Sequence, residues 1–205
     1  MPVTINGSGP IAGITSLNTS VSDVELGYLD GVTSAIQTQI NTAGGLVKIT
    51  DSSFTSGSSV ILNNVFTSTY ARYRLIMSCV TDASGGDLRS RMRLSGTNNT
   101  GATSYQRSGF LATATATLAL SGGATDHFFH GATGGVSKNV LWMELAEPAQ
   151  AESTCCQWSF WQGTGNLHYG QSAIHTVGTA YDGIELYLSA GAFTSGTVRV
   201  YGYRN

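Results

Sequence analysis

The chain has 205 residues, a formal net charge of -2 and only 11% charged residues. Soluble domains usually carry roughly 25% charged residues, so the surface is expected to owe its polarity mainly to Ser, Thr, Gly and Asn. The near-neutral charge argues against nucleic acid and acidic membrane surfaces as partners. No apolar run approaches the roughly 20 residues needed to span a bilayer, so we expect no membrane insertion.

Residues 1–19 are polar and contain Gly-Pro breaks without helical periodicity. We expect this segment to be an extended arm that becomes ordered only by docking onto other proteins of an assembly. The N-terminus lacks the basic start and apolar core of a secretion signal. This predicts synthesis and folding in the cytosol of the producing cell.

Residues 20–45 form the one passage with a convincing helical pattern. Ser22 and Glu25 match a capping box, and Asp30-Gly31 divides the passage into two pieces. Isolated helices this short are marginal in water, so the apolar seam should either pack on the neighbouring domain or associate several copies of the chain. A polar Gln39 on the seam favours association. The predicted trimerisation residues are Leu29, Val32, Ile36, Gln39 and Ile40.

Residues 25–39, ELGYLDGVTSAIQTQ, resemble a recurring segment of bacteriophage tail-fibre and related virion appendage proteins. Two later passages, NNVFTSTYARYRLIM and FTSGTVRVYGYRN, resemble strands at the two ends of C-terminal domains in such proteins. The resemblance implies a parallel homotrimer in which a short helical bundle leads into a β-rich domain. It also implies a place in the virion after synthesis in the host bacterial cytoplasm.

Residues 46–205 carry closely spaced turn signals and no helical crossover, which predicts an antiparallel, jelly-roll-like β-sandwich knob. Alternation places Tyr73, Leu75, Met77 and Cys79 on one strand face. The expected strands are 46–50, 60–66, 70–80, 88–94, 109–120, 127–130, 140–145, 154–161, 183–188 and 197–203.

Three cysteines, an odd number, do not form a disulfide framework. Cys155 and Cys156 are adjacent, so on a strand they would point to opposite faces. We expect reduced and mostly buried thiols, Cys79 included, and no cofactor.

Three arginines alternate along one predicted strand, which places them on one strand face. Such a strip would suit phosphate or an acidic sugar of a bacterial envelope. The alternative is that these side chains pair with acids such as Asp87, across strands or between subunits. The residues are Arg89, Arg91 and Arg93.

Aromatic residues gather late in the chain. Trp158 and Phe160 are expected in the core, whereas Trp161 faces the other way, beside a Gly-rich loop predicted at 163–170. An exposed aromatic ring beside such a loop can stack on a sugar; the alternative is packing at a sheet edge or subunit contact. The candidate partner-binding residues here are Trp161, His168 and Tyr169.

Metal and catalytic sites find little support. His127 and His130 would point to opposite faces of a strand, so they cannot share one metal ion. Glu144 and Glu147 fall near a strand end and are interpreted as solvent-facing. The sequence contains no serine-hydrolase elbow, zinc-protease motif or phosphate-binding loop. We therefore expect no metal, no cofactor and no enzymatic activity.

These observations favour a homotrimeric virion fibre protein that attaches a bacteriophage to a glycan or protein of the host surface. Residues 1–19 would contact other virion proteins. The alternative is a capsid or neck decoration, or head fibre, that binds no receptor. An enzyme that degrades envelope polysaccharide is least favoured, because the sequence lacks the repeats of a β-helical depolymerase.

Overall fold

A computed structural model describes residues 45–115 and 118–204. Within these ranges the chain forms strands β1 to β13, paired only in antiparallel fashion, and contains no helix. The strands belong to a compact unit that spans Gly44–Asn205. The mainly β prediction is therefore confirmed for this part of the chain. The predicted arm at 1–19 and helical segment at 20–45 lie outside the described residues, apart from Gly45, and so do the trimerisation residues from Leu29 to Ile40.

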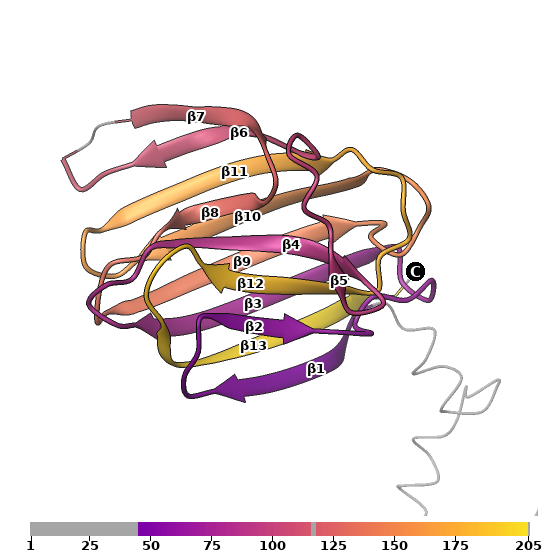
Figure 1. Ribbon diagram of the computed structural model, residues 1–205, viewed down its shortest axis with the longest axis horizontal. Coiled ribbons are helices and arrows are strands. Elements are labelled where there is room, and N and C mark those ends of the chain that lie inside the picture. Colours follow the sequence, from indigo (N-terminus) through magenta and orange to yellow (C-terminus); the bar gives the residue numbers. More distant parts are fainter. Residues whose placement is uncertain (1–44, 116–117, 205) are drawn as a thin grey trace, which may run out of the picture. The chain divides into compact units, whose positions relative to one another are not determined.

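The larger sheet has eight strands and crosses the whole unit (Figure 1). Its edges are the first strand of the unit, β1, and the second strand of a hairpin, β7. In spatial order the strands are β1 (Leu46–Phe54), β13 (Phe193–Tyr203), β3 (Arg72–Thr81), β9 (Lys138–Ala146), β10 (Thr154–Gln162), β11 (Leu167–His175), β6 (Tyr105–Ala112) and β7 (Leu118–Thr125).

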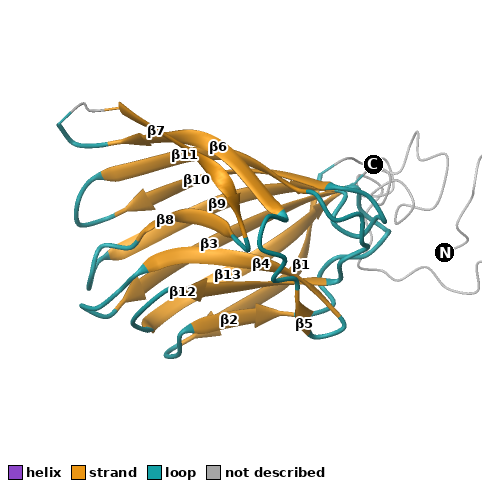
Figure 2. Cartoon of the chain, turned by 45° about the horizontal axis from the view of Figure 1, so that its top comes forward, coloured by secondary structure: helices purple, strands orange, loops and turns teal. Residues whose placement is uncertain are grey.

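The smaller sheet covers one face of the larger one, as the tilted view in Figure 2 shows. Its central strand β4 pairs with β12 on one side and with both β8 and β5 on the other. The strands are β2 (Ser59–Leu62), β12 (Gly183–Leu188), β4 (Asp87–Leu94), β5 (Thr97–Asn98) and β8 (Phe128–Ala132).

Period-two alternation explains why the two sheets pack face to face. In β3 each second residue, Tyr73 to Cys79, is buried while the residues between them are half-buried or exposed, which confirms the predicted inward face. The same alternation buries Trp158 and Phe160 of β10 and leaves Trp161 46% exposed, again as predicted. The core lies between these faces, so the outer face of each sheet is left for other contacts.

The cysteines follow the same alternation. All three are free, with Cys79 and Cys156 buried and Cys155 exposed. Cys155 and Cys156 thus point to opposite faces of β10, as predicted. Burial raises the pKa of the Cys79 thiol to about 12, so this group stays protonated at neutral pH.

The prediction was wrong in three places. The strand expected at 60–66 ends at Leu62. The expected strand at 109–120 is the β6–β7 hairpin, whose turn follows Ala112. The alternating Thr and Ala residues there continue the strand pattern and contain no Gly or Pro to mark a turn. The expected loop at 163–170 is a short turn followed by β11, because Leu167 pairs with β10 and the residues from His168 onward pair with both β10 and β6.

The unit begins and ends at one corner of the larger sheet. Leu46 pairs with Tyr203, and Arg204 donates its backbone N–H to the carbonyl of Gly45. The edge strand β1 therefore carries the junction with the preceding residues, next to the C-terminal strand.

Candidate functional site: a trench on the outer face of the larger sheet

Strand register places two aromatic residues and two small residues in one row across the outer face of the larger sheet. Phe110 of β6 is opposite Gly170 of β11, Gly170 is opposite Ser159 of β10, and Ser159 is opposite Trp142 of β9. Phe110 is 37% exposed and Trp142 is 44% exposed. The row thus has a large ring at each end and little side chain between them.

This arrangement forms a depression of about 470 Å³. We call it the aromatic trench and define it by Phe110, Trp142, Ser159 and Gly170. An adjoining depression of about 630 Å³ extends it toward the end of the sheet where Arg72 and Cys155 lie. Both volumes fall in the range of small-molecule binding sites.

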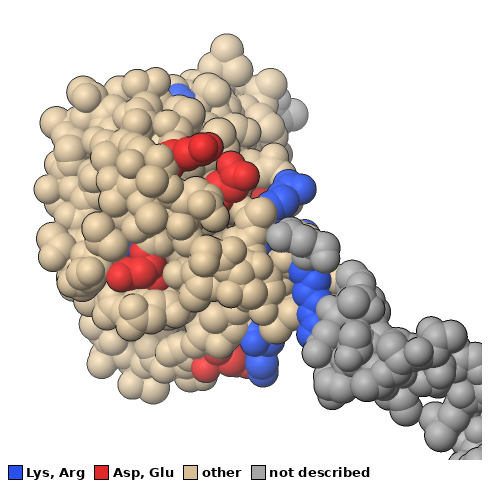
Figure 3. Space-filling view, turned by 90° about the vertical axis from the view of Figure 1, so that its right-hand side faces the viewer, with Lys and Arg blue, Asp and Glu red and all other residues tan. Residues whose placement is uncertain are grey.

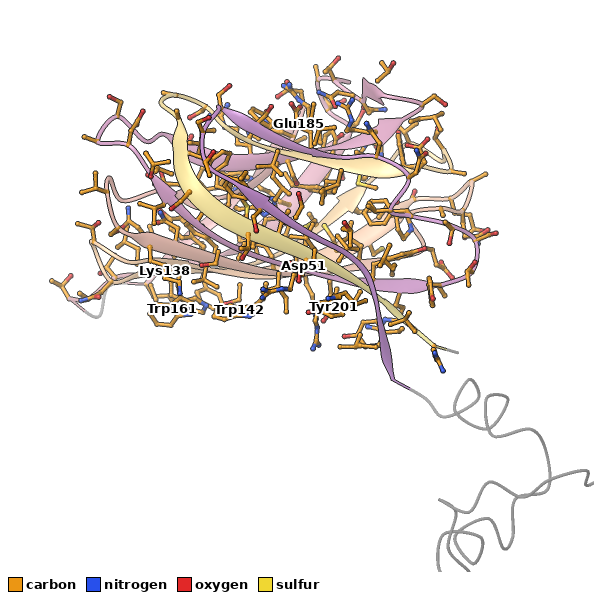
Figure 4. All side chains as sticks on the ribbon, turned by 90° about the horizontal axis from the view of Figure 1, so that it is seen from below. Asp51, Lys138, Trp142, Trp161, Glu185 and Tyr201 are labelled. Atoms are coloured by element: carbon orange, nitrogen blue, oxygen red, sulfur yellow. The ribbon has the colours of Figure 1, made fainter. Side chains whose placement is uncertain are left out.

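A second pair of aromatic rings lies beside the trench. Trp161 of β10 stacks on His168 of β11, with ring centroids 4.7 Å apart and planes 19° apart. Phe110 contacts the other side of His168 edge-on at 5.8 Å. Trp161 is paired with Val140, two residues before Trp142, so the two indoles are diagonal neighbours on one face. Figure 4 shows both tryptophans on the same side of the sheet.

Local sequence explains why these rings hold their positions. A side chain at Gly170 would meet the ring of Phe110, so glycine is what allows the phenyl ring to lie over β11. Ser159 Oγ and His168 Nε2 are 2.8 Å apart and hydrogen-bonded, which fixes the imidazole against Trp161. The aromatic surface is therefore preorganised.

Polar side chains form the next row across the same strands. Ser108, Ser172, Gln157 and Glu144 are opposite one another in turn, and all four line both depressions. Consecutive outward residues on a strand are about 7 Å apart. The row thus places hydroxyl, amide and carboxylate groups alongside the aromatic surface, which is the mixture that binds a sugar ring and its hydroxyls.

Glu144 is anchored rather than solvent-facing, which corrects the sequence-based interpretation. Its Oε1 accepts hydrogen bonds from Arg74 Nε at 2.5 Å and from the Tyr203 hydroxyl at 2.8 Å. The hydrogen bond to Glu144 raises the pKa of the Arg74 guanidinium. Glu147, by contrast, is exposed and begins the turn after β9 with a φ of 57°.

The three arginines of β4 lie elsewhere, on the outer face of the smaller sheet. Arg89 donates to Asp87 at 2.8 Å, and Arg91 donates to the side chain of Asp126 and to its carbonyl. The guanidinium of Arg91 also lies 4.8 Å from the ring centroid of Tyr187. Arg89 and Arg91 thus pair with acids of the same chain, which is the alternative to binding an anionic partner.

Arg93 is held even more completely. It is only 7% exposed and donates to Asn63, Asn98 and the carbonyl of Gly96. Glu185, opposite Arg91 in register, supplies a third acid beside Asp87 and Asp126. Arg89 and Arg91 are thus each paired with an acid, whereas Arg93 is bound by neutral oxygens and Glu185 accepts a hydrogen bond from Asn98. All three guanidinium groups have partners within the chain.

The structure separates the remaining predicted site residues. Trp161 and His168 come together, but Tyr169 points inward, is 6% exposed and packs against Phe129 and Phe160, each at 5.9 Å. It belongs to the core. The arginines of β4 and the Trp161–His168 pair lie on opposite outer faces of the sandwich, as Glu185 and Trp161 illustrate in Figure 4.

His127, just before β8, and His130, within β8, point to opposite sides as predicted. His127 contacts Asp126 and the ring of Tyr187 on the outer side, whereas His130 is fully buried beside Ser90 and Trp158. Within 45–115 and 118–204, no three His, Cys, Asp or Glu side chains gather as metal ligands would.

Charge is sparse on the unit as a whole. Figure 3 shows one end of the sandwich, where uncharged residues cover most of the surface, basic groups line one side and acidic groups are scattered. In the described ranges no helix is long and apolar enough to cross a membrane. On this sparsely charged surface the trench combines exposed aromatic rings with a polar row.

Four of the side chains that line the depression were not indicated as site residues by the sequence: Phe110, Trp142, Glu144 and Gln157. Trp142 lies between buried Leu141 and Met143, so alternation was a sufficient signal for its outward direction. The other three depend on which strands are neighbours, and the sequence does not specify this.

Comparisons with known proteins add little. No protein-family model matches the chain, and the search of curated proteins gave no match. Among solved structures, the chain is similar to a protein of unknown function from Shewanella oneidensis MR-1, with 9% identity, a TM-score of 0.25, and coverage of 91% of this chain and 97% of that one. A similarity of that size carries no argument about function.

Proposed function

We propose that the β-sandwich is the jelly-roll-like knob of a homotrimeric bacteriophage virion fibre and that it attaches the virus to the host surface by binding a glycan in the aromatic trench. The observation that carries the proposal is the aromatic trench itself. Its two exposed rings, Phe110 and Trp142, lie beside the polar row that contains Gln157 and Glu144. Apolar ring faces and hydroxyl partners within one depression match the two kinds of surface that a sugar presents.

The assembly part of the proposal rests on the sequence. Residues 20–45 would form the short trimeric helical segment, and residues 1–19 would anchor the fibre to other virion proteins. Three trenches on one trimer would act together, because a second contact made by a tethered site is effectively intramolecular. Weak binding by each trench is then sufficient for firm attachment.

Binding of the full-length protein to bacterial cells and to immobilised cell-surface polysaccharides tests the adhesion proposal. We expect Trp142→Ala and Trp161→Ala each to reduce binding at least tenfold. Ile61→Ala is the matched control, since Ile61 is 48% exposed on the outer face of the other sheet. Equal binding by all three variants would contradict the proposal.

The same variants separate adhesion from subunit packing. Light scattering should give a trimer for the wild type and for all three variants. A wild-type monomer would overturn the trimer. A trimer that dissociates in Trp161→Ala would show that this ring is a subunit contact instead.

If no cell or polysaccharide is bound, capsid or neck decoration becomes the better explanation. Labelled antibody imaged on intact virions would then locate the protein over the head, the neck or the tail. Hydrolysis of the polysaccharide, measured as released reducing ends, would favour the hypothesis that the protein degrades envelope polysaccharide.

A further inference from the structure

One ionisable group lines the aromatic trench, and it is an acid. The side chains around the trench are aromatic, hydroxyl or amide, apart from Glu144. Neither Arg72 nor Arg74 lines it. A ligand in the trench therefore meets a carboxylate and no lining cation.

The position of this carboxylate is fixed from one side. Across the sheet, Glu144 is opposite Arg74 of β3 in one direction and opposite Gln157 of β10 in the other. Arg74 and Tyr203 both bind Oε1, whereas Oε2 is buried and receives no hydrogen bond from the protein, so it is an acceptor that a donor on the ligand could satisfy. The cationic partner thus approaches from β3, and the trench lies on the side of Gln157.

This asymmetry has a chemical consequence for the ligand. A carboxylate can accept hydrogen bonds from sugar hydroxyls, which are neutral donors. A uronic acid, phosphate or sulfate placed in the trench would instead bring a second negative charge close to Glu144. Arg74, which is paired with Glu144 on the side away from the trench, offsets part of this repulsion. Between unit charges about 5 Å apart, partly screened by solvent and salt, the repulsion that remains corresponds to at most roughly a tenfold loss of affinity.

We infer that the aromatic trench selects an uncharged glycan chain over its acidic counterpart and that Glu144 sets this preference. The inference rests on the proposed glycan-binding function and adds the ligand's charge class to it. The arginines of β4 agree with it, because Arg89 and Arg91 are paired with acids and Arg93 is bound by neutral oxygens of the same chain.

The aromatic surface also indicates the direction and length of the ligand. Phe110, His168, Trp161 and Trp142 come from four adjacent strands, β6, β11, β10 and β9. With strands 4.7–4.9 Å apart, this surface extends about 14 Å across the sheet. A short oligosaccharide that crosses the strands fills it, whereas a single sugar ring contacts only part of it.

The test uses linear oligosaccharides immobilised as matched pairs, in which each neutral chain is accompanied by the uronic-acid chain of the same linkage. Suitable pairs are galactan with galacturonan, glucan with glucuronan and mannan with mannuronan, each from one to four sugar units. Binding of the full-length wild type is compared with Glu144→Gln and with the control Glu185→Gln, on the other sheet. The amide of Glu144→Gln can still accept from Arg74, and thermal unfolding checks that the variant is folded.

We expect the wild type and Glu185→Gln to prefer the neutral member of each bound pair by up to about tenfold, with affinity rising up to the trisaccharide. Glu144→Gln should bind both members within about twofold of each other.

Equal or tighter binding of the acidic chains by the wild type would overturn the inference while leaving glycan binding intact. So would a preference that Glu144→Gln leaves unchanged. If the wild type binds the uronic-acid chains and Arg72→Gln does not, these chains bind in the adjoining depression instead. Binding to no pair at all would overturn the proposed function, and this inference with it.

Discussion

The indole of Trp161 and the imidazole of His168 are stacked face to face, 4.7 Å apart, across the turn that joins β10 to β11. The two rings form one rigid apolar surface on the outside of the larger sheet. Because Trp161 is 46% exposed, its contacts within the chain are limited to this stack and its immediate neighbours. A change at Trp161 should therefore affect the proposed glycan binding more than it affects the stability of the fold.

We predict that Trp161→Ala lowers the free energy of unfolding by about 1–2 kcal/mol, since a stacked aromatic pair contributes roughly 0.5–1.5 kcal/mol and the half-buried indole adds some burial. Phe160→Ala, one residue away and fully buried, should cost about 3–5 kcal/mol. Urea denaturation followed by circular dichroism measures both values. Similar losses in the two variants would show that Trp161 is part of the folding core.

Two glycines on neighbouring strands should respond differently to alanine. A Cβ at Gly109 would lie 2.3 Å from the carbonyl oxygen of Gly170, which is backbone and cannot move away. We expect Gly109→Ala to destabilise the unit by about 1–3 kcal/mol, as overpacking generally does.

The atoms nearest to a Cβ at Gly170 would all belong to the ring of Phe110, a side chain that can move more easily than backbone. Gly170→Ala should therefore cost less than about 1 kcal/mol but displace the ring and weaken glycan binding. Denaturation and binding measured on both variants check the pair. A stable Gly109→Ala would contradict the register of β6 and β11.

Buried histidines should make the unit sensitive to acid. Burial lowers the pKa of His130 to about 3 and lowers the pKa of His175 as well. In the unfolded chain both titrate near 6.5, so below that pH the unfolded state binds more protons than the folded state. Stability is therefore highest above pH 6.5 and falls as the pH drops from 6.5 toward 3, by up to about 1.4 kcal/mol per pH unit for each fully neutral histidine.

The variant His130→Gln tests this origin. Glutamine can still bond to Ser90, the partner of His130 Nε2 at 2.8 Å, but it does not titrate. Denaturation at a series of pH values from 7.5 to about 4.5 should show a shallower decline for the variant. An unchanged slope would mean that other groups cause the acid sensitivity.

Thiol reactivity should distinguish the three cysteines. Burial raises the pKa of Cys79 to about 12 and that of Cys156 well above its usual range, and both side chains are enclosed. Because the thiolate is the reactive species, a thiol reagent should label native protein once, at exposed Cys155. Cys155→Ser should abolish labelling until denaturant is added. Rapid modification of Cys79 in the native protein would contradict the burial of β3.

The sequence predicted most of the layer structure through alternation alone. The burial of Tyr73 and the exposure of Trp161 both follow from period two, which is a local property of a strand. Where local signals were weak the prediction was wrong. The turn after Ala112 has no Gly or Pro, and β11 contains Gly170 and too many polar residues to resemble a strand.

The trench could not be predicted in the same way, because it is a property of strand neighbours. Phe110 reaches the row only because β6 pairs with β11, although β7 to β10 separate these two strands in the sequence. Glu144 is held in place by a hydrogen bond from Arg74, a residue 70 positions earlier in the chain. Non-local pairings of this kind leave no periodic trace in either segment.

The corner where the unit begins and ends determines how it would bear tension. A pull transmitted through Gly45 acts first on the pair Leu46–Tyr203, at the open end of the edge strand β1. A glycan in the trench would contact β9, β10, β11 and β6, which are separated from β1 by β13 and β3. Force between Gly45 and the glycan would therefore pass across the sheet from strand to strand. Because β1 can peel from β13 one pair at a time, the lifetime of an attachment under flow would be limited by this edge strand as much as by the sugar contacts.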